Sequence, residues 1–287
     1  MQSISIVGCG YTGLRLAARW IGLGAAVRGF ATRPESLAQI AATGAAAAAL
    51  DLDAAADAAP IDCGGHIVYY AVPPAPTGDG DPRLERFLGR VSGTPGRMVY
   101  LSTTGVYGDR GGAVVDEDTP AAPRTGRALR RLAAEDFLRG WAAQRGVSWC
   151  ILRVPGIYGP GRLPLDRLRR AEPAIAPPEA SPGNRIHVTD LVTACVAAGA
   201  GEPADRRIFN VTDGTDDSLT DYLQRVARIT GLPAPPLVSR AVAARELSAS
   251  AWSFLGESRR VDNRRMREEL GVAIAYRDLD EGIRASL

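Results

Sequence analysis

The stretch ISIVGCGYTG (residues 4–13) decides the fold. An apolar strand leads into the pattern G-x-G-x-x-G, and a helical segment follows at once. In such a unit Gly8 makes a tight turn, Gly10 lets a pyrophosphate approach the backbone, and Gly13 lets helix and strand pack closely. The free N–H groups at the start of the helix favour an anion. The stretch therefore predicts a dinucleotide-binding loop, although a structural glycine turn has the same pattern.

Short apolar runs and helical runs alternate over the first 153 residues. Strands are predicted at Ser3–Val7, Ala25–Phe30, Ala45–Leu50, His66–Val72, Arg97–Leu101 and Val147–Arg153. Helices are predicted at Thr12–Leu23, from Pro34, at Leu84–Val91 and at about Arg127–Arg145, where Leu129, Leu132, Ala133, Phe137 and Trp141 form one apolar face. This alternation predicts an α/β fold with a Rossmann-type, doubly wound parallel sheet.

The pattern loosens in the second half, which is rich in proline and glycine between Pro155 and Gly183. Predicted elements here are a short helix at Leu165–Arg170, a helix at Leu191–Ala200 capped by Asp190, a strand at Ile208–Val211, and helices at Leu219–Thr230 and Arg264–Leu270. We therefore expect a dinucleotide-binding Rossmann domain over residues 1–153. Residues 154–287 are expected to complete the sheet and to form a small C-terminal substrate-binding lobe.

The composition excludes several classes of protein. The 287 residues include 34 basic and 32 acidic side chains, and every basic one apart from the histidines is arginine, because the sequence contains no lysine. A formal charge of +2 gives no reason to expect a nucleic-acid or membrane partner. Four scattered cysteines and two histidines fit neither a metal site nor a disulfide framework. We expect a cytoplasmic monomer or homodimer that acts on a small molecule.

The end of the second predicted strand indicates the cofactor. An NAD site would place Asp or Glu there, about 20 residues after the glycine loop. Thr32 and Arg33 stand there instead and can bind a 2′-phosphate, which favours NADP over NAD. An exposed arginine at a helix start is the alternative. Further cofactor contacts are expected from Tyr11, Thr12, Asp51, Leu52, Ala71, Val72, Pro73, Ser102 and Pro155.

Four further segments carry a family resemblance. They are LSTTGVYGD (101–109), LRVPGIYGPGR (152–162), RIHVTDL (185–191) and FNVTDG (209–214). Together with the glycine loop, they resemble the extended and atypical short-chain dehydrogenases/reductases, the NAD-dependent epimerase/dehydratase family. The resemblance implies a Rossmann domain, a nicotinamide cofactor and a small substrate-binding lobe. It also implies a catalytic Ser or Thr and a Y-x-x-x-K motif.

The chain departs from that catalytic pattern. Thr103 stands at the hydroxyl position, four residues before Tyr107. Counting back from Glu135, which resembles the acid that follows the motif, Arg131 takes the lysine position and Arg127 the tyrosine position. Arginine stays protonated and cannot exchange a proton, but it can bind an anion in a fork. The pair therefore predicts either an anion site at the nicotinamide or a solvated arginine face. Arg131 can also pair with Glu135.

Three other side chains could transfer a proton: Tyr107, Tyr158 and His187. In this family a tyrosine at the position of Tyr107 is often packed, and the context of His187 resembles a structural junction between sheet and helix. The sequence predicts an atypical NADP(H)-dependent oxidoreductase, a reductase or an epimerase-like enzyme, that acts on a small anionic substrate without the Tyr/Lys pair. A non-catalytic NADP-binding sensor or scaffold protein is the alternative.

Overall fold

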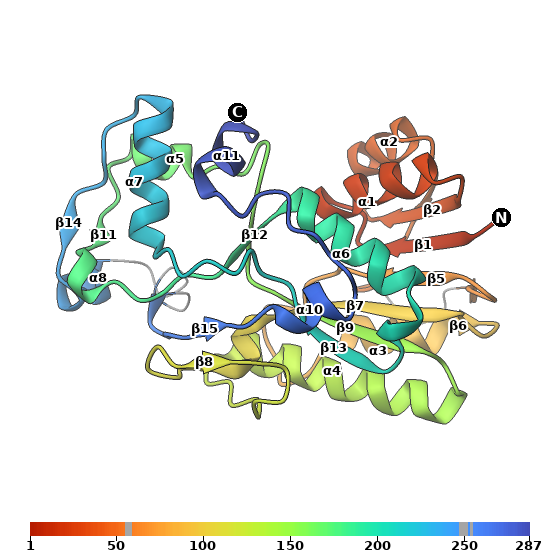
Figure 1. Ribbon diagram of the computed structural model, residues 1–287. Coiled ribbons are helices and arrows are strands. Elements are labelled where there is room, and N and C mark those ends of the chain that lie inside the picture. The colour runs from red at the N-terminus through yellow and green to blue at the C-terminus, as the bar shows by residue number, and fades with distance from the viewer. Residues whose placement is uncertain (55–58, 247–251, 253–254) are drawn as a thin grey trace.

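A seven-stranded parallel sheet forms the centre of the computed structural model, which describes residues 1–54, 59–246, 252 and 255–287 (Figure 1). The strands follow the order β13 (Arg207–Asn210), β9 (Trp149–Val154), β7 (Arg97–Thr103), β5 (Ile67–Tyr70), β1 (Ser3–Val7), β2 (Ala26–Ala31) and β3 (Ala46–Ala49). The predicted α/β fold with a doubly wound sheet is confirmed. Strand β13, the last strand of this sheet along the chain, pairs with β9 and so extends the sheet from the second half of the sequence.

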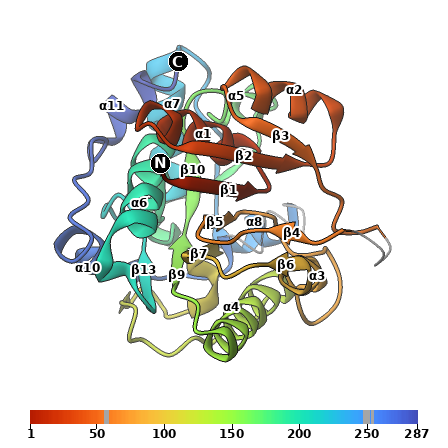
Figure 2. The ribbon, with the colours of Figure 1, turned by 90° about the vertical axis from the view of Figure 1, so that its right-hand side faces the viewer.

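Helices cover both faces of this sheet (Figures 1 and 2). One face carries α1 (Tyr11–Gly22), α2 (Pro34–Ala42) and α6 (Val188–Ala200), and the other carries α3 (Pro82–Arg90) and α4 (Gly126–Arg145). Leu16 and Leu191 pack in the first hydrophobic cluster, Phe87 and Leu138 in the second. Burial on both faces explains why the central strands are continuous apolar runs.

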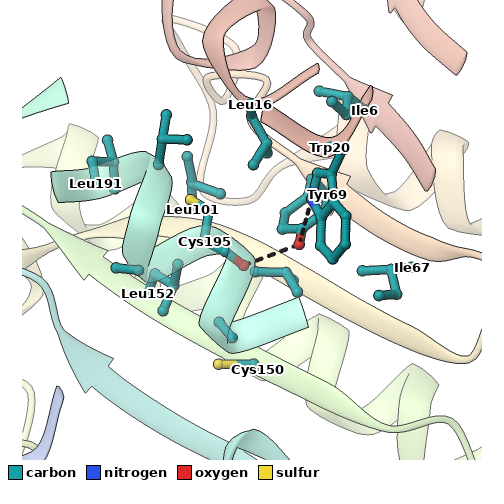
Figure 3. Packing of buried hydrophobic residues seen from close by; sticks show 14 of the residues in the cluster. Ile6, Leu16, Trp20, Ile67, Tyr69, Leu101, Cys150, Leu152, Leu191 and Cys195 are labelled. Carbon is teal, nitrogen blue, oxygen red and sulfur yellow. Dashed lines mark hydrogen bonds between the residues drawn. The ribbon is translucent and has the colours of Figure 1, made fainter. Parts of the chain in front are cut away.

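A short hydrogen-bond chain joins α1, β5 and α6 inside the first cluster (Figure 3). The indole N–H of Trp20 donates to the Tyr69 hydroxyl at 3.1 Å, and that hydroxyl donates to the carbonyl of Cys195 at 3.0 Å. Tyr69 is fully buried, so these partners offset the cost of removing its hydroxyl from water.

The buried face of α4 differs from the predicted one. Leu129 and Phe137 are 48% and 41% exposed, whereas Glu135 and Leu138 are fully buried. The prediction was wrong for Leu129 and Phe137, and it left Glu135 out of the packed face. Its carboxylate instead forms a buried ion pair with Arg153 of β9, at 2.8 Å, which places a charged residue in the centre of the packed face.

A smaller lobe gathers around Tyr158. It contains α5 (Leu165–Arg169), α7 (Leu219–Thr230) and α11 (Leu279–Arg284), whose apolar side chains form a separate cluster. The predicted N-cap Asp190 is wrong: the side chain of His187 accepts the capping bond of α6, from the N–H of Thr189. The Asp190 carboxylate instead accepts the backbone N–H groups of Ala275 and Tyr276 and so fixes the C-terminal segment.

Short elements complete the chain. The strand pairs are β4 (Ile61–Asp62) with β6 (Val91–Ser92), β10 (Gly156–Tyr158) with β12 (Arg185–His187), β11 (Ala174–Ile175) with β14 (Leu237–Val238), and β8 (Val114–Val115) with β15 (Arg260–Val261). Among the described residues, the remaining helices are α8 (Arg240–Glu246), α10 (Arg264–Glu268) and the 3₁₀ turns η1 (Thr104–Tyr107), η2 (Pro177–Glu179) and η3 (Glu202–Ala204). Across the described chain, none of the helices has the length and apolar character needed to span a lipid bilayer.

Candidate functional site

A cavity of about 910 Å³ opens at the carboxyl ends of the central strands, where ligands bind in doubly wound sheets. Every residue predicted for the cofactor site lines it: Gly8, Gly10, Tyr11, Thr12, Gly13, Thr32, Arg33, Asp51, Leu52, Ala71, Val72, Pro73, Ser102 and Pro155. The lining also includes Ser36, Asp53, Arg83, Arg130 and Arg162, which the sequence did not single out. Asp53 directly follows the predicted contacts Asp51 and Leu52, so the prediction for this segment ended one residue too early.

The three glycines of the loop differ in what a Cβ at each position would contact. Gly8 has φ +81°, and a Cβ there would lie 2.8 Å from the backbone nitrogen of Val72. A Cβ on Gly13 would lie 3.1 Å from the Ile6 side chain. Gly10, by contrast, has no described atom within 4 Å of its Cβ position and lines the cavity. Gly8 and Gly13 thus serve the protein's own packing, whereas Gly10 leaves open space for a ligand.

The field in this cavity favours an anion. Helix α1 begins at Tyr11 with no acidic residue in its first turn and no side-chain cap at Gly10, so its first N–H groups face the cavity. Six arginines line the cavity against two aspartates, and Asp53 is already paired with Arg83, whose Nε donates to it at 2.8 Å. That bond lowers the pKa of the Asp53 carboxyl. The lining therefore fits a dinucleotide with its two phosphates.

The far end of the cavity lies beside β2 and α2. Arg33 is the N-cap residue of α2 and is exposed at the rim together with Thr32. Ser36 lines the same end one turn later. Of the two carboxylates that line the cavity, Asp51 accepts the backbone N–H of Asp53, and Asp53 is paired with Arg83. Cationic and hydroxyl groups thus occupy the end where an NAD-type site carries an acid.

A second cavity of about 430 Å³ adjoins the first. Five residues line both: Thr103, Arg127, Pro155, Ile157 and Arg162. The smaller cavity carries five arginines, and Glu257 is its one carboxylate among the described residues. Arg185 is 5% exposed, and its guanidinium Nη1 has no hydrogen-bond partner in the described part of the chain. This lining fits a negatively charged ligand.

Arg127 and Arg131, two of the arginines of α4, have different environments. Arg127 lies at the N-terminal end of α4 and lines both cavities. Burial lowers its pKa, an effect that the charge of Glu257 opposes. Arg131 lines only the larger cavity, where its Nη1 donates to the Tyr100 hydroxyl and to the carbonyl of Leu101, both at 3.0 Å. The first of these arginines can therefore face a ligand from the junction, while the second braces the ends of two strands.

The expected pair between Arg131 and Glu135 does not form. Glu135 binds Arg153 and accepts the hydroxyl of Ser102, so it has no role in holding Arg131. Thr103 stands at the junction of the cavities and accepts the N–H of Gly105 at 3.1 Å. Its own O–H hydrogen can point to a ligand.

The other proton-transfer candidates are packed side chains. Tyr107 is fully buried, lines neither described cavity and donates its hydroxyl to Asn210 Oδ1 at 2.8 Å, so this hydroxyl faces the protein core and not a ligand. Tyr158 lines the smaller cavity, but its hydroxyl oxygen lies only 2.2 Å from where Gly282 would carry a Cβ, so it points toward α11. His187 lies between Thr189 and Ser286, and burial lowers its pKa.

Sequence reasoning missed Glu257 and Arg259, which belong to the smaller cavity. They reach it because β15 pairs with β8, more than a hundred residues away along the chain. The sequence around Glu257 and Arg259 has no motif or periodicity that would indicate this placement.

Comparisons with known proteins agree with this geometry. A model described as the NAD dependent epimerase/dehydratase family matches residues 86–212. Protein YeeZ of Escherichia coli (strain K12) is 28% identical over 97% of each chain. A solved structure of a conserved protein of unknown function from Silicibacter pomeroyi DSS has a TM-score of 0.81 and 30% identity, and covers 99% of this chain and 98% of that one.

A more distant structure shares the fold. UDP-glucuronic acid 4-epimerase from Bacillus cereus, solved in complex with NAD, has a TM-score of 0.74 and 16% identity over 99% of this chain and 97% of that chain. With its glycine loop, its anion-favouring cavity and these relatives, the chain belongs to the NAD-dependent epimerase/dehydratase family.

Proposed function

We propose that this chain is an NADP(H)-dependent oxidoreductase, a reductase or an epimerase-like enzyme, that acts on a small anionic substrate without a Tyr/Lys pair. The observation that carries the proposal is Arg127, which stands at the family's tyrosine position and lines both cavities. A group at that junction can touch a cofactor bound in the larger cavity and a substrate bound in the smaller one. Residues 1–153 would bind the dinucleotide, and residues 154–287 would complete the sheet and form the substrate lobe.

The adenosine end of the larger cavity supports NADP over NAD. Thr32 and Arg33 can bind a 2′-phosphate, and a carboxylate there would repel one. The relative from Bacillus cereus was solved with NAD, so this preference would be a departure from it. The four cysteines are free and buried, which fits the reducing cytoplasm.

When bound, the nicotinamide accepts or supplies a hydride at the substrate carbon. The protein's part is to bind and to orient. Arg127 holds an anionic group of the substrate in a fork, because arginine stays charged even where burial lowers its pKa. The Thr103 hydroxyl donates a hydrogen bond to the reacting oxygen. Arg131 keeps the carboxyl ends of β5 and β7 in place through Val72 and Leu101.

Turnover with NADPH tests the proposal. The panel would contain aldehydes and ketones that carry a carboxylate or a phosphate, with UDP-sugars added. We expect Arg127→Ala to lower kcat/KM by about 10- to 150-fold, which corresponds to the ~1.5–3 kcal/mol of a charged hydrogen bond. Arg127→Tyr should lose activity as well, because a phenol does not bind an anion as a cation does.

Arg139→Ala is the matched control, because Arg139 lies on the same helix, is exposed and lines neither described cavity. If Arg127→Ala matched the parent, the substrate role of Arg127 would be refuted. If the parent bound NADPH but turned over no member of the panel, the alternative of an NADP-binding sensor or scaffold would gain.

A further inference from the structure

The segment 255–259 forms a fixed wall of the smaller cavity. The carbonyl of Ser258 accepts the N–H groups of Arg110 and Gly112, at 2.9 and 3.1 Å. The N–H of Ser258 donates to Asp109 Oδ1 at 2.9 Å, and Arg240 donates to the carbonyl of Gly256 at 3.0 Å. These contacts from both sides hold the backbone beside Glu257 in one place.

Glu257 has the geometry of a group that can accept a proton. Its side chain is 11% exposed, and its Oε2 binds the Arg259 guanidinium at 2.8 Å. Its Oε1 is buried and has no hydrogen-bond partner among the residues that the structure describes. A buried carboxylate oxygen without a donor is costly, so this oxygen is suited to receive a hydrogen bond from a ligand hydroxyl.

The position of Glu257 relative to Arg127 points to the reacting end of the cavity. Both residues line the smaller cavity with Thr103, and they are close enough for the charge of Glu257 to influence Arg127. The other charged groups beside the segment are Arg259 and, through their bonds to its backbone, Arg240 and Asp109. The charged groups around Glu257 are therefore three arginines and one further carboxylate.

We infer that Glu257 exchanges a proton with the substrate oxygen, the task that an arginine at the tyrosine position cannot perform. The inference rests on the proposed function and deepens it. In the oxidising direction, the Glu257 carboxylate forms an O–H bond as the O–H bond of the substrate alcohol breaks. The carbinol carbon loses its hydride to the oxidised nicotinamide and becomes a carbonyl carbon. The proton then passes from Glu257 to water, and the reducing direction is the reverse.

The test compares Glu257→Gln with Glu257→Asp and with the exposed control Glu268→Gln, which removes a carboxylate that lines neither described cavity. The rate of alcohol oxidation with NADP⁺ is measured across pH. In the parent we expect activity to fall at acidic pH as Glu257 takes up a proton. Glu257→Gln should lower kcat by ~10²–10⁴-fold and remove that acidic limb. Glu257→Asp should retain part of the activity and the limb.

A second measurement needs no turnover. Oxalate, which stays ionised above about pH 5, is titrated calorimetrically in buffers of different ionisation enthalpy. An anion bound beside Glu257 should cause proton uptake near pH 5.5 in the parent and in Glu268→Gln, and none in Glu257→Gln. Uptake that survives in Glu257→Gln, or an unchanged pH profile in that variant, overturns the inference while the proposed function stands. If no protein shows turnover, the proposed function fails, and oxalate uptake that depends on Glu257 then shows only that this carboxylate takes up a proton beside a bound anion.

Discussion

Two buried carboxylates, Glu135 and Asp213, differ in how their oxygens are hydrogen-bonded. Glu135 is fully buried but satisfied, because Arg153 and Ser102 bind its two oxygens. Asp213 is also buried, but only its Oδ1 is bonded, to the backbone N–H and the hydroxyl of Thr215, both at 2.9 Å. Its Oδ2 has no partner within the described residues. Both oxygens of Glu135 are therefore paired, whereas burial disfavours the ionised form of Asp213.

Asp213 should make folding stability depend on pH. Burial raises its pKa to about 6 in the folded chain, against an ordinary value of 3.8. The folded state thus holds the proton more tightly, so this contribution is complete below about pH 4 and is lost as pH rises through about 6. A difference of about two pH units corresponds to at most about 3 kcal/mol.

The measurement is urea unfolding of the parent and of Asp213→Asn between pH 4 and pH 7. The amide mimics the neutral carboxyl, so we expect the variant to gain stability relative to the parent as pH rises. A difference between the two free energies of unfolding that stays flat across this range would contradict the account.

The loop between β1 and α1 must satisfy two requirements: close packing inside the protein and open space for a ligand. Gly8 and Gly13 are required by contacts inside the protein, whereas Gly10 borders only the cavity. The φ of Gly10, −96°, lies outside the left-handed region that favours glycine, and a Cβ there would meet no described atom within 4 Å. A side chain there should therefore leave the fold intact and block only the ligand.

We expect Gly10→Val to unfold at the same temperature as the parent but to lose NADPH binding. Gly22→Val is the matched control, because Gly22 ends the same helix and has no described atom within 4 Å of its Cβ position. Thermal melting and fluorescence titration with NADPH check both proteins. Parent-like binding by Gly10→Val would show that the pyrophosphate does not lie against this loop.

Across the whole molecule, the strands and the glycine loop could be predicted from the sequence because local patterns indicate them. The seven strands of the sheet lie where apolar runs indicated them, and β1 has the predicted bounds Ser3–Val7. The glycine loop was recognisable because its residues are contiguous. The buried face of α4 was misjudged, since nothing near Glu135 in sequence shows that Arg153 would neutralise it. Long-range pairing also placed Glu257 in the smaller cavity, where no local signal pointed.

The central claim is that the larger cavity binds NADP(H) with its adenosine end at Arg33. Calorimetric titration of the parent with NADPH and with NADH tests it most directly. We predict one site per chain and a preference for NADPH of about 10- to 150-fold, the ~1.5–3 kcal/mol of a charge-assisted contact to phosphate. Arg33→Ala should abolish that preference, whereas Arg19→Ala, at an exposed position of α1, should keep it. Equal affinities for the two cofactors in the parent, or no binding of either, would contradict the claim.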